Sequence, residues 1–210
     1  MLVDTQSIME LNRAIRQISE IHDQIHRTGI YRGIRSFPVA LAGVVGLLAA
    51  AFQHLIIGLK PKPRLFVYYW VCVAVFNIIM NFSMITWRYF TKELPRERRK
   101  TLHVAEQFMP CLAAGFVVTL GALFMGGRIL NLLPGLWAII FSMGSFATRP
   151  YQPKRSGWIA LYYLLSGTVL LSLAPSGKSL NPWCMGIVFG VGHIMSGGVL
   201  YWNLERKREE

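Results

Sequence analysis

Six long apolar runs alternate with short polar segments along this chain of 210 residues. Each run has about 18 to 23 residues, or about 27 to 35 Å of α-helix, which is enough to cross about 30 Å of hydrocarbon. The pattern predicts an all-α polytopic membrane protein with six transmembrane helices across residues 37–202, after an N-terminal segment (1–36) and before a basic tail (203–210). The six runs are Phe37–Gly58, Leu65–Trp87, Val104–Met125, Ile129–Thr148, Gly157–Ala174 and Trp183–Trp202.

The connections between the runs are too short for a soluble domain. On one side of the predicted bundle the connections are short and lie near Leu59–Arg64, Gly126–Arg128 and Pro175–Pro182. The connections on the other side are not much longer. Any binding or chemistry is therefore expected inside the bundle, on its basic rim, or on the N-terminal segment.

Lysine and arginine are divided unequally between the two ends of the predicted bundle. Of the 22 such residues, all but five fall on the side of the two termini. Because short cytoplasmic segments carry an excess of Lys and Arg, both termini and the Arg88–Lys100 loop are predicted to be cytoplasmic. The five residues on the predicted outer side are Lys60, Lys62, Arg64, Arg128 and Lys178.

The composition supports a membrane protein, and the charge follows from the same topology. The chain is 53% hydrophobic and only 15% charged, with a net charge of +12. A basic inner rim faces anionic lipid headgroups, so no nucleic-acid partner is needed to explain the charge. We expect contacts to lipid or to partner proteins from Arg13, Arg16, Arg96, Arg98, Arg99 and Lys100.

The segment from about Ser7 to Arg27 is predicted to be an amphipathic helix outside the membrane. Ser7 and Glu10 have the spacing of a capping box, and apolar residues recur at three- and four-residue steps on one helix face. This helix lies either at the membrane interface or in a short coiled-coil seam with a second copy or a partner.

His193 is the most informative polar residue within a predicted span. It lies near the middle of the bilayer, where ionisable groups are costly and usually have a use. It is predicted either to bind a ligand or relay a proton, or to be a neutral side chain that forms an interhelical hydrogen bond, with Ser142, Ser145, Asn77 and Asn81 as possible partners. Three glycines are predicted to place the imidazole in a close helix-packing seam, and these are Gly186, Gly190 and Gly197.

A short internal repeat suggests three successive helical hairpins. Phe82-Ser83-Met84 in the second run matches Phe141-Ser142-Met143 in the fourth, and Phe189-Gly190-Val191 occupies the corresponding place in the sixth. Four positions after the three phenylalanines come Thr86, Ser145 and His193. The repeat predicts one polar position per hairpin at related places in the fold.

Signatures of enzymes, metal sites and driven transporters are missing from the sequence. No metal-ligand cluster, cysteine pair or hydrolase motif occurs, and two histidines at matching depth for haem are lacking. All ten acidic residues fall outside the hydrocarbon or at its inner edge, whereas coupled transporters usually use a buried acid. We therefore expect no enzyme activity, no metal and no cofactor.

The last third of the chain carries a glycine-rich pattern of low specificity. Gly135-Leu136-Trp137 leads into Ile140-Phe141, and Phe189-Gly190 is followed by Gly192-His193-Ile194 and Gly197. This order resembles the G-L-W…F-G-x-G-H-I…G pattern of small multi-span bacterial membrane proteins, which are mostly uncharacterised. The resemblance implies only that this segment is a shared packing element, and it brings no reaction with it. The expected location is the bacterial inner membrane.

These features predict a non-enzymatic integral membrane subunit, scaffold or regulator. Such a protein assembles with itself or with other membrane proteins through its basic rim and N-terminal helix. The alternative is a small-solute channel or facilitator with His193 in its lumen.

Overall fold

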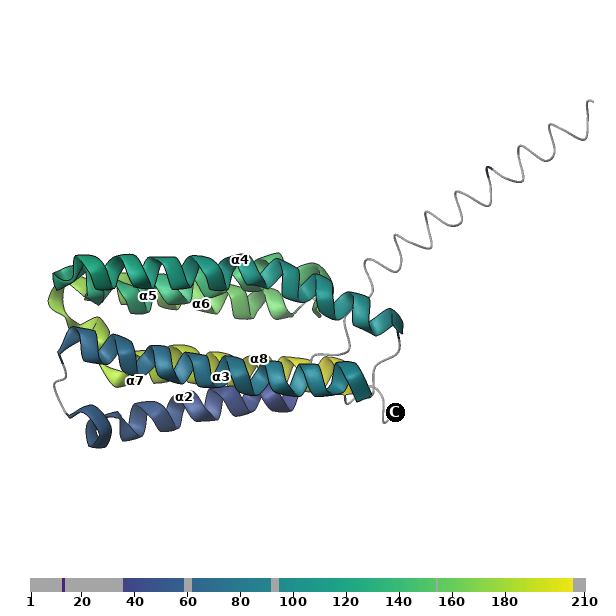
Figure 1. The fold of residues 1–210 in the computed structure, drawn as a ribbon, viewed down its shortest axis with the longest axis horizontal. Coiled ribbons are helices and arrows are strands. Elements are labelled where there is room, and N and C mark those ends of the chain that lie inside the picture. The colour runs from purple at the N-terminus through teal and green to yellow at the C-terminus, as the bar shows by residue number, and fades with distance from the viewer. Residues whose placement is uncertain (1–12, 14–35, 59–61, 92–94, 154, 206–210) are drawn as a thin grey trace, which may run out of the picture. The chain divides into compact units, whose positions relative to one another are not determined.

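The computed structural model describes residues 13, 36–58, 62–91, 95–153 and 155–205 (Figure 1). The chain divides into two units, Met1–Ile30 and Tyr31–Glu210, and all labelled helices belong to the second. Most of the predicted amphipathic helix, including Arg16, lies outside the described residues. Arg13 is described, and it is helical and exposed.

All six predicted transmembrane helices are confirmed, each being long and apolar enough to cross a membrane. The first three spans lie in α2 (Ser36–Ile57), α3 (Pro63–Thr91) and α4 (Pro95–Met125). The fourth combines the 3₁₀-helix η1 (Gly127–Leu132) with α5 (Leu133–Ala147), and the fifth is α6 (Ser156–Leu173). The sixth runs through α7 (Pro182–Met185), the π-helix η5 (Gly186–Val191), α8 (Gly192–Leu200) and the π-helix η6 (Tyr201–Glu205).

Proline and glycine mark the ends of these helices. Pro63 opens α3 and Pro182 opens α7, positions where the missing N–H costs nothing. Asn181 caps α7 by accepting a hydrogen bond from the Trp183 backbone N–H. Gly58 after α2 and Gly126 after α4 both have positive φ, which lets the chain leave each helix abruptly. Both glycines therefore stand where one predicted span ends and the next begins.

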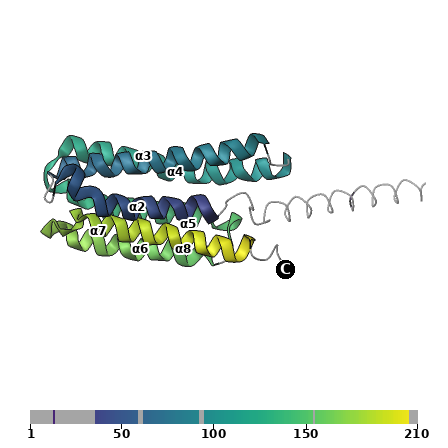
Figure 2. The ribbon, with the colours of Figure 1, turned by 90° about the horizontal axis from the view of Figure 1, so that it is seen from below.

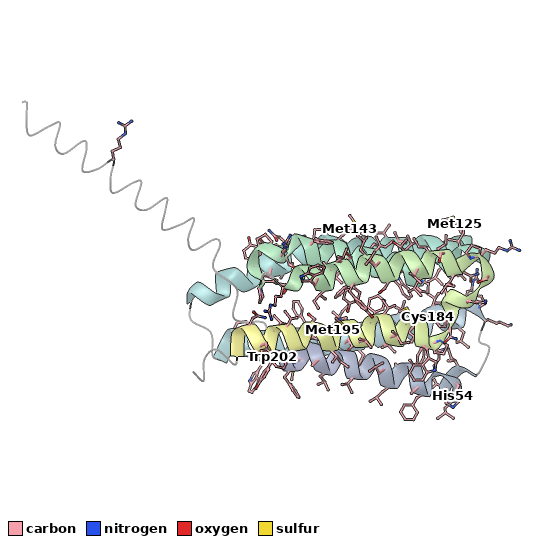
Figure 3. All side chains as sticks on the ribbon, turned by 180° about the vertical axis from the view of Figure 1, so that it is seen from behind. His54, Met125, Met143, Cys184, Met195 and Trp202 are labelled. Carbon is pink, nitrogen blue, oxygen red and sulfur yellow. The ribbon has the colours of Figure 1, made fainter. Side chains whose placement is uncertain are left out.

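The helices form two layers of three. One layer has the order α3–α2–α8 and the other the order α4–α5–α6, and Figures 1 and 2 show them from two directions. Figure 3 shows His54 and Met125 at one end of the bundle and Trp202 at the opposite end. The two helices of each predicted hairpin are neighbours in the structure. The first two hairpins each lie within one layer, whereas the third has α6 in one layer and α8 in the other.

The two layers meet along only part of their width. A cluster around Tyr163, Ala138 and Val188 joins them where α6 faces α8. A second cluster, around Val67, Ala122 and Leu133, joins α3 to α4 and α5 at the predicted outer end. Only 17% of the α3 span and 11% of the α4 span are buried, against 28–39% of the other four. Helices α3 and α4 thus form the open side of the bundle.

Glycines allow α2 and the sixth span to touch at backbone distance. A Cβ on Gly43 would lie 2.5 Å from the Gly190 carbonyl oxygen, and one on Gly186 would lie 2.5 Å from Ala50 Cβ. Gly197 meets Ala40 in the same way. This is the small-residue packing that brings membrane helices together. The predicted glycine seam is therefore found in the structure, with α2 as its partner.

The internal repeat does not bring its three members together. The rings of Phe141 and Phe189 pack at 6.0 Å, but Phe82 is 54% exposed on α3. Thr86 is likewise exposed. The second span thus differs from the other two in its surroundings, because α3 lies at the open side of the bundle.

Candidate functional site

A cavity of about 310 Å³ lies between the two layers. Its walls come from α2, α3, α4, α5 and the sixth span, and they are almost entirely apolar. The volume falls within the range of about 300–1,000 Å³ that is typical of small-molecule sites. None of the described side chains that line the cavity is charged. It is therefore shaped for an uncharged, mostly apolar molecule.

The cavity opens between α3 and α4. Val75 and Ile78 of α3 and Phe116 of α4 border it, and all three are exposed. Toward the predicted outer end the two helices are joined by the cluster of Val67 and Ala122, which closes the opening there. Because α3 and α4 are membrane-spanning, the opening faces the acyl chains of the lipid rather than water.

Aromatic rings form one wall of the cavity. Phe141 lies at the centre of this group, with its ring 4.7 Å from that of Tyr163, 5.1 Å from that of His193 and 5.4 Å from that of Phe108. The rings come from four different helices, so their packing holds the two layers in register and gives the cavity a firm floor.

His193 joins this aromatic group to the cavity. Its Nδ1 atom lies 2.8 Å from the Tyr163 hydroxyl and 2.7 Å from the Phe189 carbonyl oxygen. In one tautomer Nδ1 donates to Phe189, and in the other it accepts from Tyr163. Since Nδ1 is occupied in both, Nε2 is the ring atom left for the cavity. It offers an acceptor in the first tautomer and a donor in the second.

Asn77 supplies a second polar group to the same cavity. Its Nδ2 atom donates to the Val73 carbonyl oxygen one turn earlier, at 3.1 Å. Its Oδ1 atom is buried and has no hydrogen-bond partner among the described residues. A buried acceptor without a donor costs about 1–3 kcal/mol. Asn77 is therefore a residue of the cavity wall whose carbonyl acceptor is buried and unused.

Three other polar side chains of the wall are engaged in hydrogen bonds, and one of them, Trp70 Nε1, donates to Gln53 Oε1 at 2.9 Å. Trp137 Nε1 donates to the Thr119 hydroxyl at 2.8 Å, and that hydroxyl donates to the Gly115 carbonyl oxygen at 2.6 Å. This chain of hydrogen bonds fixes the indole between α4 and α5. Among the described side chains of the wall, the Asn77 amide, the His193 ring and the Cys111 thiol remain as polar groups.

The structure brings some of the predicted site residues together and separates others. His193 and Asn77 line the cavity. Asn81 donates to the Asn77 carbonyl oxygen and Ser145 to the Phe141 carbonyl oxygen, each within its own helix. These two residues and the exposed Thr86 are not part of the cavity wall.

Two details of the His193 prediction are wrong. The interhelical hydrogen-bond partner is Tyr163, while Ser142 donates to the Ala160 carbonyl oxygen. The imidazole also lies beside the glycine seam rather than in it. Gly190 faces α2, whereas His193 packs on Phe141 and Tyr163 of the other layer. Residues three apart on a helix differ by about 60° in direction, which is enough to put them against different neighbours.

Four of the predicted contacts on the basic rim come from the start of α4. Arg96, Arg98, Arg99 and Lys100 belong to the first two turns of α4. Their side chains, like Arg16, lie outside the described part of the chain. Their role toward lipid or a partner stays a prediction.

Tyr163 and the second glycine seam were missed by reasoning from the sequence. Tyr163 is fully buried, yet it stands in an apolar run next to Tyr162 with nothing to distinguish the two. Gly135 and Gly167 bring α5 and α6 together, and a Cβ on either would lie under 3.0 Å from the other helix. In the sequence, this seam is indicated only by the presence of small residues in both spans.

Metal-ligand clusters are lacking in the described ranges, where no group of three or more His, Cys, Asp or Glu side chains is close enough to share an ion. The three cysteines, Cys72, Cys111 and Cys184, are free thiols.

No family model matches this chain, and no curated protein or solved structure is significantly similar to it. The resemblance to small bacterial membrane proteins therefore stays a prediction.

Proposed function

We propose that this protein is a non-enzymatic membrane protein that binds a neutral, mostly apolar molecule, taken sideways from the bilayer into the cavity between its helix layers. The observation that carries this proposal is that Asn77, whose Oδ1 atom has no partner among the described residues, and His193 line the same apolar cavity, which opens to lipid. The proposal develops the sequence-based alternative, in which His193 faces a solute.

The wall chemistry defines the kind of ligand. An apolar body matches the aliphatic and aromatic side chains, and its transfer from lipid needs no passage through water. Asn77 Oδ1 requires a donor, so the ligand carries a hydroxyl or an N–H group. A charged group is disfavoured because the wall offers no ion of opposite sign. An alcohol with a hydrocarbon or ring body satisfies all three requirements.

A pair of fluorescent probes tests this chemistry. 1-Pyrenebutanol carries the hydroxyl, and 1-butylpyrene lacks it. With the protein in lipid nanodiscs, energy transfer from tryptophan to pyrene measures binding as a function of probe mole fraction in the lipid. We expect saturable binding and a roughly tenfold preference for the alcohol, the upper range for one neutral hydrogen bond. In Asn77→Leu, which removes the acceptor, the preference should fall to about one.

Two results contradict the proposal in this assay. Energy transfer that rises in proportion to probe concentration without saturating indicates probe dissolved in lipid and no site. A preference for the alcohol that is equal in wild type and Asn77→Leu shows that Asn77 does not contact the ligand. Asn81→Leu is the matched control, since Asn81 lies one turn further along α3 and outside the cavity wall.

Assembly with other membrane proteins remains a second proposal. Its support is the low coverage of α3 and α4, whose exposed side chains include Phe76, Phe116 and Phe124. These faces contact either lipid or another membrane protein, and a homo- or hetero-oligomer would cover them. Native mass spectrometry tests whether the protein forms a homo-oligomer. A dimer or larger species supports self-association, and a monomer at all concentrations counts against it.

We further infer from the charge asymmetry that both termini are cytoplasmic, and the bacterial inner membrane stays the expected location. A single cysteine introduced at Glu97, in an otherwise cysteine-free variant, should not react with a membrane-impermeant thiol reagent in intact cells. One introduced at the exposed Ser176 should react. The reverse pattern would show that the orientation is inverted.

A further inference from the structure

Three cations line one depression at the predicted outer end of the bundle. Lys62, Arg64 and Arg128 surround a depression of about 500 Å³ formed where α3 begins and η1 follows α4. All three side chains are exposed. They make up most of the positive charge on a side of the protein that otherwise carries only Lys60 and Lys178.

No carboxylate among the described residues of the helices that form the depression can neutralise this cluster. The sequence has no Asp or Glu between residues 24 and 92 or between residues 107 and 204, and every element at this end belongs to those ranges. Like charges in one depression repel one another unless an anion lies between them. The described part of the bundle therefore supplies no counter-charge for Lys62, Arg64 and Arg128.

The backbone adds to the positive potential and fixes the cluster in place. Helix α3, which is 29 residues long, begins at Pro63, so the positive end of its dipole lies at the depression. The Lys62 carbonyl oxygen accepts hydrogen bonds from the Leu65 and Phe66 N–H groups and thereby ties Lys62 to the first turn. Arg64 reaches the Leu123 carbonyl oxygen at 3.5 Å, near the end of α4. The depression is thus a fixed feature of the α3–α4 junction.

We propose that this depression binds a phosphate group, and that its source is the headgroup of an anionic phospholipid. Arginine offers a planar fork of donors that matches phosphate oxygens, and lysine adds a point charge. The apolar spans Pro63–Met84 and Val104–Met125 start and end at this level, so the depression lies where lipid phosphates are found. Soluble phosphate has the same chemistry and is the other possible source.

Native mass spectrometry of the delipidated, full-length protein in a neutral detergent tests the site. We compare binding of phosphatidylglycerol, phosphatidylcholine and inorganic phosphate to wild type and to Lys62→Gln/Arg128→Gln. Arg155→Gln/Lys178→Gln is the matched control, because it removes the same charge from exposed positions outside the depression. We expect affinity for the first phosphatidylglycerol to fall roughly tenfold or more in the Lys62/Arg128 variant and to change little in the control.

The outcomes distinguish a lipid phosphate from soluble phosphate, and both from failure of the proposal. If inorganic phosphate binds with the same dependence on Lys62 and Arg128 while phosphatidylglycerol shows none, the site stands and its anion is soluble phosphate. If both double variants lose the same affinity for every anion, the site is overturned, because the loss then follows from the lower net charge of the protein. Arg128→Lys should retain most of the affinity, which distinguishes loss of charge from damage to the fold.

Discussion

Replacing Gly43 by alanine should lower the thermal stability of the bundle more than any other single methyl group added to a described helix. The new Cβ would lie 2.5 Å from the Gly190 carbonyl oxygen and 2.8 Å from the Ile194 backbone N. Both atoms belong to backbone, which cannot rotate away as a side chain can. The helices must separate, and overpacking of this kind costs about 1–3 kcal/mol. The midpoint of thermal unfolding in detergent measures the effect.

Gly198→Ala is the control for this prediction. Gly198 lies on the sixth span near the seam, but a Cβ there has no neighbour within 4 Å. Alanine is the better helix former, so this variant should be as stable as wild type or slightly more stable. Equal midpoints for Gly43→Ala and Gly198→Ala would contradict the close contact between α2 and the sixth span.

Filling the cavity should abolish ligand binding without unfolding the protein. Gly115 lines the cavity from α4, and a Cβ there meets only Ile140 Cγ2, at 4.0 Å. Gly115→Leu adds four carbon atoms that extend into the cavity, which removes space from a site of about 310 Å³. We expect saturable binding of 1-pyrenebutanol to weaken at least tenfold, which corresponds to about 1.4 kcal/mol or more. The unfolding midpoint should stay close to that of wild type.

Gly121→Leu provides the comparison on the same helix. A Cβ on Gly121 has open space around it, and Gly121 is not part of the cavity wall. This variant should bind the probe like wild type. If both leucine variants bind equally well, the probe occupies another place and the cavity is not the binding site.

The sequence predicted the fold well because membrane insertion depends on local properties. Span length, apolar content and loop charge are each readable within about 20 residues, and the six confirmed helices follow from them. Helix neighbours were harder to predict. Lipid is as apolar as leucine, so the hydrophobic pattern of a span does not show which face meets another helix. The layered order α3–α2–α8 and α4–α5–α6 could not be read from that pattern.

The candidate site was predicted only in part for the same reason. His193 stands out because it is a rare ionisable group at membrane depth, and Asn77 was noted as a polar neighbour. Tyr163 could not be assigned as the partner, because that depends on α6 facing α8 across the layers. The glycine seam was recognised on the sixth span, but its partner residues on α2 are ordinary small side chains such as Ala40 and Ala50. Depth along a helix is local information, whereas the direction of a side chain depends on the whole bundle.

Photolabelling tests the central claim, that the cavity takes an uncharged apolar alcohol from the bilayer. The probe is a long-chain alcohol with a diazirine on its chain, added to the protein in nanodiscs, irradiated, and mapped by peptide mass spectrometry. We predict labels on the cavity-lining stretches of α3 (70–78) and α4 (108–119), reduced by excess unlabelled alcohol and by Gly115→Leu. Labels spread over all exposed apolar faces, and unchanged by competitor or by Gly115→Leu, would contradict the account.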